Sequence, residues 1–262
     1  MKLQNKVVMI TGASSGLGEQ IAYAAAKQGA TLVLLARRIQ RLQQIKIDCE
    51  ELSGAPVFIY HLDIGNEEQI VTTLPQICQE VGNIDILVNS AGFGLFREAL
   101  DMPMELTKDM FKVNVLGLME ITKIVAKRMK NQRGGQIINI ASQASKMATS
   151  KSSVYAATKF AVRGYSNALR LELHPFGINV LTVNTGPMRT DFSLVADETG
   201  EYLNSLGRWV LEPKQVAKRV VRYMLTTKRE INLPIMMEVG ARLYDLFPTV
   251  GDYLARTKFA RK

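Results

Sequence analysis

The chain has 262 residues, of which 47% are hydrophobic and 22% are charged. These values fit one globular domain with a sizeable core and exclude a disordered chain. Two cysteines are too few for a disulfide scaffold, and no run approaches the roughly 18 apolar residues of a membrane span. The N-terminal segment lacks the pattern of a secretory signal. We therefore expect a soluble protein in the reducing cytoplasm.

The formal net charge is +9, and most of it lies in the last fifth of the chain. Residues 214–262 hold 11 Lys and Arg against 4 Asp and Glu, which gives +7. A solvated surface is the commonest explanation of such a cluster. Alternatives are subunit packing, peripheral contact with anionic lipid, contact with an acyl carrier protein, and nucleic-acid binding. We expect no nucleic-acid partner.

Apolar runs alternate with helix-like segments along the chain. We expect strands at 7–11, 31–36, 57–60, 85–88, 136–140, 178–183 and 231–233. We expect helices at 19–28, 38–52, 66–81 (with Asn66 as the N-cap), 106–131, 152–173 and 213–225. Strands that are apolar throughout are typical of a parallel sheet covered by helices on both faces.

The sequence thus predicts one Rossmann-type, doubly wound α/β domain over residues 1–262, with a parallel sheet of about seven strands. The segment 186–212 is irregular and follows the sixth strand, so it is predicted to be a substrate-binding lid. Residues 234–262 form a basic, amphipathic C-terminal extension.

A glycine-rich turn follows the first predicted strand, with Gly12, Gly16 and Gly18 in the spacing G-x-x-x-G-x-G. Glycines at this place let the backbone turn tightly and approach a pyrophosphate, which the N-terminus of the next helix attracts. A glycine trio alone is weak support, but its position after the first strand favours a dinucleotide site.

The residue after the second strand indicates which dinucleotide binds. NAD-dependent enzymes place an acidic residue there for the ribose 2′-hydroxyl, whereas this chain has Arg37 and Arg38. A guanidinium pairs with a 2′-phosphate, and Ser14 of the glycine turn adds a hydroxyl donor. The sequence predicts NADP(H), unless both arginines are merely solvated at the start of a helix.

Tyr155 and Lys159 are four residues apart and share one face of a predicted helix. A nearby ammonium stabilises a phenolate and lowers the pKa of a tyrosine from about 10, which suits proton exchange with a carbonyl oxygen. The spacing alone occurs by chance on solvated helices. Parallel strands, however, bring their carboxyl ends to one edge, where the following residues would gather: Gly18, Arg37, Asp63, Asn89, Ser142 and Gly186.

In these motifs the chain resembles the short-chain dehydrogenase/reductase family, single-domain type, from Lys6 to about Leu233. Thr11–Gly18 matches the family's TGxxxGxG turn, and Asp63 matches the acidic residue that contacts adenine. Asn89–Gly92 matches its NNAG motif, with Ser90 as a mild departure. The remaining matches are the catalytic tetrad of Asn114, Ser142, Tyr155 and Lys159 and the nicotinamide loop Gly186–Thr190.

The resemblance implies that Tyr155 is the general acid or base, Lys159 binds the nicotinamide ribose and Ser142 bonds the substrate oxygen. Asn114 would anchor a water that relays protons to Lys159. The implied cofactor contacts are Gly12, Ser14, Ser15, Gly16, Leu17, Gly18, Arg37, Arg38, Asp63, Ile64, Asn89, Ala91, Gly92, Tyr155, Lys159, Pro187 and Thr190. The family also implies a homodimer or homotetramer built on the helices at 106–131 and 152–173.

The expected substrate is a small carbonyl or alcohol compound, mainly apolar. Its predicted contacts, besides Ser142 and Tyr155, are Phe93, Leu95, Phe96, Ala144, Met147, Met188, Phe192 and Leu194. Several of these side chains could instead pack the core or the lid. No Cys or His spacing indicates a metal site.

The sequence therefore predicts an NADP(H)-dependent oxidoreductase. One alternative is a catalytically silent NADP(H)-sensing regulator on the same fold, although such proteins typically lose the tyrosine or the lysine. Another is a sugar epimerase or dehydratase, although these usually carry a G-x-x-G-x-x-G turn and a larger C-terminal region.

Overall fold

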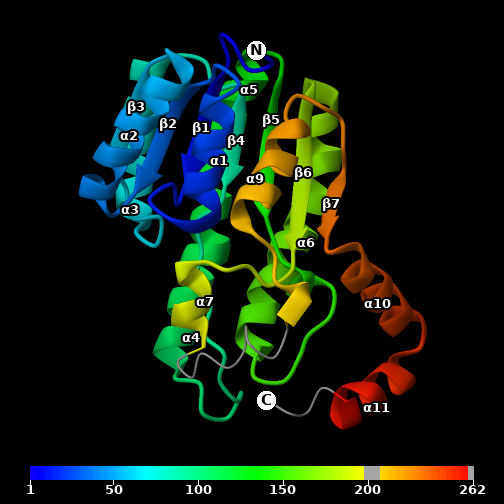
Figure 1. Cartoon of the computed structure of the whole chain (residues 1–262). Coiled ribbons are helices and arrows are strands. Elements are labelled where there is room, and N and C mark those ends of the chain that lie inside the picture. The colour runs from blue at the N-terminus through cyan, green and yellow to red at the C-terminus, as the bar shows by residue number, and fades with distance from the viewer. Residues whose placement is uncertain (198–206, 259–262) are drawn as a thin grey trace.

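Seven parallel strands form one sheet in the order β3-β2-β1-β4-β5-β6-β7 in the computed structural model, which describes residues 1–197 and 207–258 (Figure 1). The strands are β1 (Val7–Thr11), β2 (Thr31–Ala36), β3 (Val57–His61), β4 (Ile86–Asn89), β5 (Gly135–Ile140), β6 (Ile178–Thr185) and β7 (Glu230–Leu233). The middle strands β1, β2 and β4 are buried almost throughout, as continuous apolar runs predict. The prediction of a seven-stranded, doubly wound fold is confirmed.

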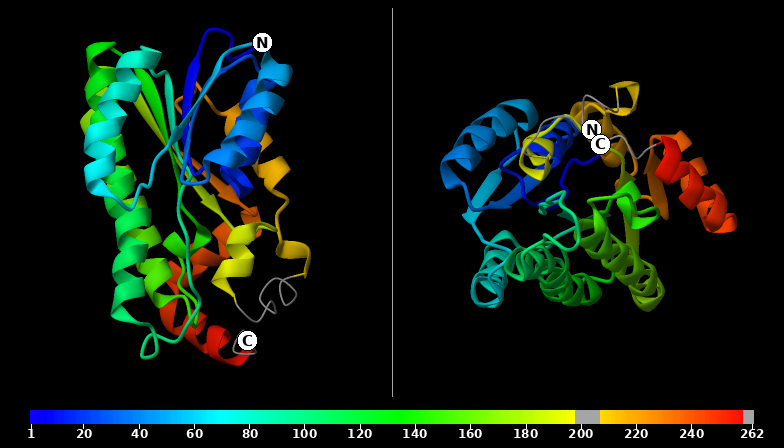
Figure 2. Two further views of the ribbon diagram at one scale, coloured as in Figure 1. Left: turned by 90° about the vertical axis from the view of Figure 1, so that its left-hand side faces the viewer. Right: turned by 90° about the horizontal axis from the view of Figure 1, so that it is seen from below.

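Helices cover both faces of the sheet (Figure 2). On one face lie α1 (Gly16–Ala26), α2 (Ile39–Ser53) and α9 (Pro213–Arg222), whose apolar side chains share a core with the sheet. On the other face lie α3 (Glu67–Val81), α5 (Leu118–Asn131) and α6 (Ser153–Leu173). Asn66 caps α3 as predicted, because its side chain accepts a hydrogen bond from Gln69 N at 3.0 Å.

The strand order reverses between β1 and β4, and folds of this type bind ligands beyond the carboxyl ends of the strands at such a point. The segments that follow β1, β4, β5 and β6 meet at this end of the sheet, where α4 (Met104–Phe111) and α7 (Asp191–Ala196) lie (Figure 1). The fold therefore brings the predicted motifs to one edge.

The long helix predicted at 106–131 is wrong in one respect. A π-helical turn at Lys112–Gly117 separates α4 from α5. At this turn Gly117 lies directly against the carbonyl oxygen of Ile64, where a side chain would collide. Apolar periodicity does not distinguish a continuous α-helix from one that contains a single wide turn, and such turns are frequent at functional sites.

The structure also adds detail at the predicted lid and extension. Part of the segment 186–212 is helical, namely α7, while residues 198–206 lie outside the described part. The extension folds into α10 (Ile235–Leu246) and α11 (Pro248–Lys258), which project beyond the sheet (Figure 1). Among the described helices, none combines the length and the apolar character needed to cross a bilayer.

Candidate active site

The glycine turn after β1 is built from close backbone contacts. Gly12 and Gly16 have φ angles of +66° and +57°, which favour glycine. A Cβ atom at Gly12 would lie 2.6 Å from the Cα atom of Ala91, and one at Gly18 would collide with the carbonyl oxygen of Gly12. Only glycine therefore fits at Gly12 and Gly18.

The helix that follows this turn can bind an anion. Its N-cap, Ser15, makes no side-chain capping bond to a described residue, so first-turn N–H groups of α1 remain available. Thr11 Oγ1 accepts hydrogen bonds from the backbone nitrogens of Ser90 and Ala91, at 3.1 and 3.2 Å, which fastens β4 to the turn. This cradle fits the pyrophosphate of a dinucleotide.

Two arginines lie beside the cradle, after β2. Arg38 donates to Ser14 through Nε (to Oγ, 3.2 Å) and Nη2 (to the carbonyl oxygen, 3.3 Å). Arg37 is exposed, and its Nη1 lies 4.0 Å from Asp63 Oδ2. The structure thus brings together the basic and acidic side chains that the sequence assigns to the adenosine end of a cofactor.

Asn89, the last residue of β4, links this strand to its neighbours. Its Nδ2 donates at 2.9 Å to both Thr122 Oγ1 and Asn139 Oδ1, which join β4 to α5 and β5. Its buried Oδ1 has no hydrogen-bond partner among the described residues. The neighbouring departure from the family motif, Ser90, keeps its backbone bond to Thr11, so the substitution leaves this link intact.

Tyr155 and Lys159 lie on one buried face of α6. The Tyr155 ring is 8% exposed and is flanked by Phe96 and Phe192, at centroid distances of 6.0 and 5.5 Å. Lys159 Nζ lies 5.7 Å from the Tyr155 ring centroid and donates to the carbonyl oxygen of Ile140 at 3.2 Å. Burial lowers the pKa of Lys159 to about 8, so the ammonium predominates at neutral pH but is easily lost above it.

Ser142 follows β5 at the same edge. Its Oγ accepts a hydrogen bond from Ala144 N at 3.1 Å and donates to the carbonyl oxygen of Thr185 at 3.3 Å. The side chain is half-buried. The hydroxyl is therefore fixed by the ends of β5 and β6 and remains partly accessible.

Asn114 lies on the π-helical turn and is buried. Its Oδ1 accepts from Phe93 N at 2.9 Å, and its Nδ2 donates to the carbonyl oxygen of Phe93 at 2.8 Å and to Thr158 Oγ1 at 3.1 Å. A Cβ atom at Gly92 would lie 2.9 Å from Asn114 Oδ1 and 3.6 Å from Lys159 Nζ. Asn114 thus holds the segment after β4 against the Lys159 ammonium.

The predicted substrate contacts differ in their exposure and in their neighbours. Phe96 and Phe192 flank Tyr155, whereas Met188 packs partly on the core and Leu194 is 69% exposed. The half-buried residues are Phe93, Leu95, Ala144 and Met147. Thr190 lies beside the cofactor cradle, because a Cβ atom at Gly16 would be 3.5 Å from its side chain.

Sequence reasoning missed several contributors to the site. Thr158 and the backbone of Phe93 hold Asn114, and a buried Lys146 lies four residues beyond Ser142. The Tyr155 motif contains Thr158, so helical spacing placed it nearby without indicating its bond. Nothing in the sequence distinguishes Lys146 from a solvated lysine.

Comparisons with known proteins show the family of the chain. The family model described as short chain dehydrogenase matches residues 6–199. Mouse dehydrogenase/reductase SDR family member 7 is 32% identical over 97% of this chain and 78% of its own length.

Alignments with two solved structures cover 86% and 88% of this chain, and 94% and 97% of the respective solved chains. A serine dehydrogenase complexed with NADP+ has a TM-score of 0.77 and 32% identity. A 3-ketoacyl-(acyl-carrier-protein) reductase of Brucella melitensis, complexed with NADH, has a TM-score of 0.78 and 25% identity.

Proposed function

The chain belongs to the short-chain dehydrogenase/reductase family of oxidoreductases, and from that premise we propose an NADP(H)-dependent enzyme that transfers a hydride between the nicotinamide and a carbonyl or alcohol substrate. The observation that carries this proposal is the pairing of Tyr155 and Lys159 on one buried face of α6, where Lys159 donates to the carbonyl oxygen of Ile140, two residues before Ser142. These groups lie at the same sheet edge as the glycine cradle.

The choice of NADP(H) rests on the two arginines after β2. Structural relatives carry either NADP+ or NADH, so membership of the family leaves the cofactor open. Arg37 and Arg38 supply positive charge where a 2′-phosphate would lie, and Arg38 is already aligned with Ser14. A carboxylate at this place would repel that phosphate.

The bound nicotinamide would supply or accept the hydride. In the direction of reduction, Tyr155 donates its phenolic proton to the substrate oxygen, and in oxidation the phenolate takes the proton back. The Lys159 ammonium stabilises the phenolate, and the Ser142 hydroxyl donates a hydrogen bond to the same oxygen. Asn114 acts on Lys159 indirectly, through the segment at Gly92.

We also propose an apolar substrate. Two phenylalanine rings flank Tyr155, and the half-buried Ala144 and Met147 follow Ser142. Such a lining favours a hydrophobic ketone, aldehyde or alcohol over a sugar or a phosphorylated compound.

The test is oxidation of NADPH against a panel of ketones, aldehydes, quinones and 3-oxoacyl thioesters. The key variant is Tyr155→Phe, which removes the acidic proton and keeps the ring. We expect turnover to fall on the order of 10³-fold, with NADPH binding unchanged. The matched control is Tyr223→Phe, the same change directly after α9 and outside the site, which should keep its turnover.

Retained turnover in Tyr155→Phe would remove this residue from the mechanism. Tight NADPH binding by the wild-type protein without turnover of any compound would favour the alternative function, a catalytically silent NADP(H) sensor.

A further inference from the structure

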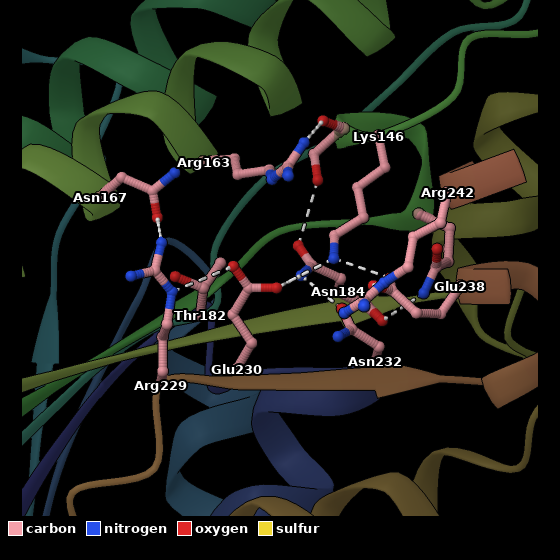
Figure 3. Close-up of polar contacts among 12 residues, drawn as sticks. Lys146, Arg163, Asn167, Thr182, Asn184, Arg229, Glu230, Asn232, Glu238 and Arg242 are labelled. Carbon is pink, nitrogen blue, oxygen red and sulfur yellow. Dashed lines mark hydrogen bonds and ion pairs between the residues drawn. The ribbon is translucent and has the colours of Figure 1, made fainter. Parts of the chain in front are cut away.

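A buried ionic cluster is centred on Lys146, four residues after Ser142 (Figure 3). Lys146 Nζ lies 2.9 Å from Glu230 Oε2 on β7 and 2.7 Å from Glu238 Oε2 on α10. Arg242 Nε, one turn further along α10, lies 2.8 Å from Glu238 Oε1. One lysine thus joins the loop after the predicted catalytic serine to the last strand and to the C-terminal extension.

Burial makes these contacts specific. The side chains of Lys146, Glu238 and Glu230 are 6%, 10% and 16% exposed. Burial by itself raises the pKa of Glu230, but the hydrogen bond and charge of Lys146, together with Arg163 and Asn232, outweigh it and hold that pKa below its usual value. Removing Lys146 would leave Glu230 and Glu238 with only the more exposed Arg229 and Arg242 as ion-pair partners, and breaking a buried pair is costly.

Neutral side chains continue the network toward Ser142. Ser145 Oγ donates to Asn184 Oδ1 at 3.1 Å, and Asn184 Nδ2 donates to Asn232 Oδ1 on β7 at 2.7 Å. Arg163 of α6 donates to the carbonyl oxygen of Ser145 at 3.2 Å. The turn that carries Ser142 and Ala144 is therefore held from four sides, by α6, β6, β7 and α10.

The first turn of α10 also touches the second loop of the site. Gly186 N donates to the carbonyl oxygen of Leu233 at 2.6 Å. A Cβ atom at Gly186 would lie 2.8 Å from Pro234 Cδ and 3.0 Å from Met237 Sδ. Gly186 begins the segment that carries Pro187 and Thr190, so α10 contacts both loops on the substrate side.

We propose that α10 is a positioning element of the active site and that Lys146 and Glu238 are its positioning residues. Glu238 holds the Ser142 turn through Lys146, while Pro234 and Met237 hold the Gly186 segment. The substrate oxygen would then meet Ser142 and the Gly186 segment in a relative placement that depends on the C-terminal extension. This inference rests on the proposed oxidoreductase function and concerns residues that lie outside the family motifs.

The test compares Lys146→Met with Lys146→Arg and with a control. Lys123→Met removes a lysine from a surface pair on α5, with Glu120 at 3.2 Å. For Lys146→Met we expect kcat to fall on the order of tenfold and KM for the carbonyl substrate to rise, because the serine is displaced. The dissociation constant of NADPH should change by a smaller factor than KM, since the glycine cradle lies on the other half of the sheet and only the Gly186 segment reaches both. Lys146→Arg should restore kcat, and Lys123→Met should match the wild type.

Glu238→Gln is the second variant, in case Lys146→Met does not fold. It keeps the shape and removes the charge, and it should change kcat and KM in the same direction by a smaller factor. Wild-type kcat and KM in a folded Lys146→Met protein would overturn the inference. So would an equal loss of NADPH affinity, which would indicate general destabilisation.

Hydrogen exchange separates this inference from the proposed function, because it needs no substrate. In Lys146→Met, amides of residues 142–147 and 186–190 should exchange faster, whereas those of residues 12–18 should not. A protein that reduces none of the carbonyl compounds would refute the proposed function, and the exchange pattern would still decide whether α10 holds the two loops. Unchanged exchange in both segments would overturn the coupling.

Discussion

The two halves of the binding edge are built differently. The cofactor half, around β1, β2 and β4, consists of backbone contacts that leave no room for a Cβ atom at Gly12 or Gly18. The substrate half, around β5 to β7, consists of side-chain hydrogen bonds and the buried Lys146 cluster. The glycine turn of the first half is shaped by the backbone itself, whereas the second half depends on particular side chains that meet across the fold.

This difference determines how each half should respond to mutation. A backbone cradle is broken by any added atom, whatever its chemistry. A side-chain network tolerates conservative changes and loses function by degrees. Gly18 and Arg37 test the cofactor half with steric and electrostatic changes respectively, and Lys159 tests the border between the halves.

Gly18→Ala should have the largest effect. The new methyl group would collide with the carbonyl oxygen of Gly12, and backbone cannot move aside as a flexible side chain can. We expect NADPH affinity to fall on the order of a hundredfold, about 2.7 kcal/mol, as measured by fluorescence titration.

The control for this change is Gly164→Ala, the same substitution in α6, where nothing lies within 4 Å of the added Cβ atom. There the free energy of unfolding should rise by about 0.5–1 kcal/mol, because alanine loses less backbone entropy in a helix. If the affinity of Gly18→Ala for NADPH equalled that of the wild type, the cradle would not depend on close backbone contact.

Arg37→Asp should have the next largest effect. The new carboxylate would lie near Asp63 and repel a 2′-phosphate, so the preference for NADPH over NADH should fall on the order of thirtyfold, about 2 kcal/mol. The ratio of the two dissociation constants measures it. Arg41→Asp makes the same charge change on the exposed side of α2, where Arg41 pairs with Glu19, and should shift the ratio much less. Equal shifts in both variants would mean that only overall charge matters.

The same contrast explains what the sequence could predict. Mainly apolar runs located six strands, the short segment Ile231–Leu233 located the seventh, and glycine spacing located the cradle, because these signals are local. The π-helical turn around Asn114 was missed, since apolar periodicity does not register a single wide turn.

The Lys146 cluster was also missed, for a different reason. Its partners are 84 and 92 residues away along the chain, so no local pattern indicates that they meet. The helices α10 and α11 were predicted only as an amphipathic extension. Family resemblance supplied the tetrad, but it is silent on contacts that belong to this chain.

Lys159, which lies between the two halves, should give the smallest effect. Burial lowers its pKa from 10.5 to about 8, so the folded state releases this proton at a lower pH than the unfolded state does. Between these values the unfolded chain binds more protons, and rising pH therefore favours folding. For the cofactor-free protein, we expect the free energy of unfolding to gain about 1 kcal/mol between about pH 7.5 and pH 9, relative to Lys159→Met. Urea unfolding at each pH measures this difference, and Lys123→Met should retain the wild-type rise. If the rise persisted in Lys159→Met, another group would be responsible for it. Burial of the Lys159 ammonium would then not lower the free energy of unfolding.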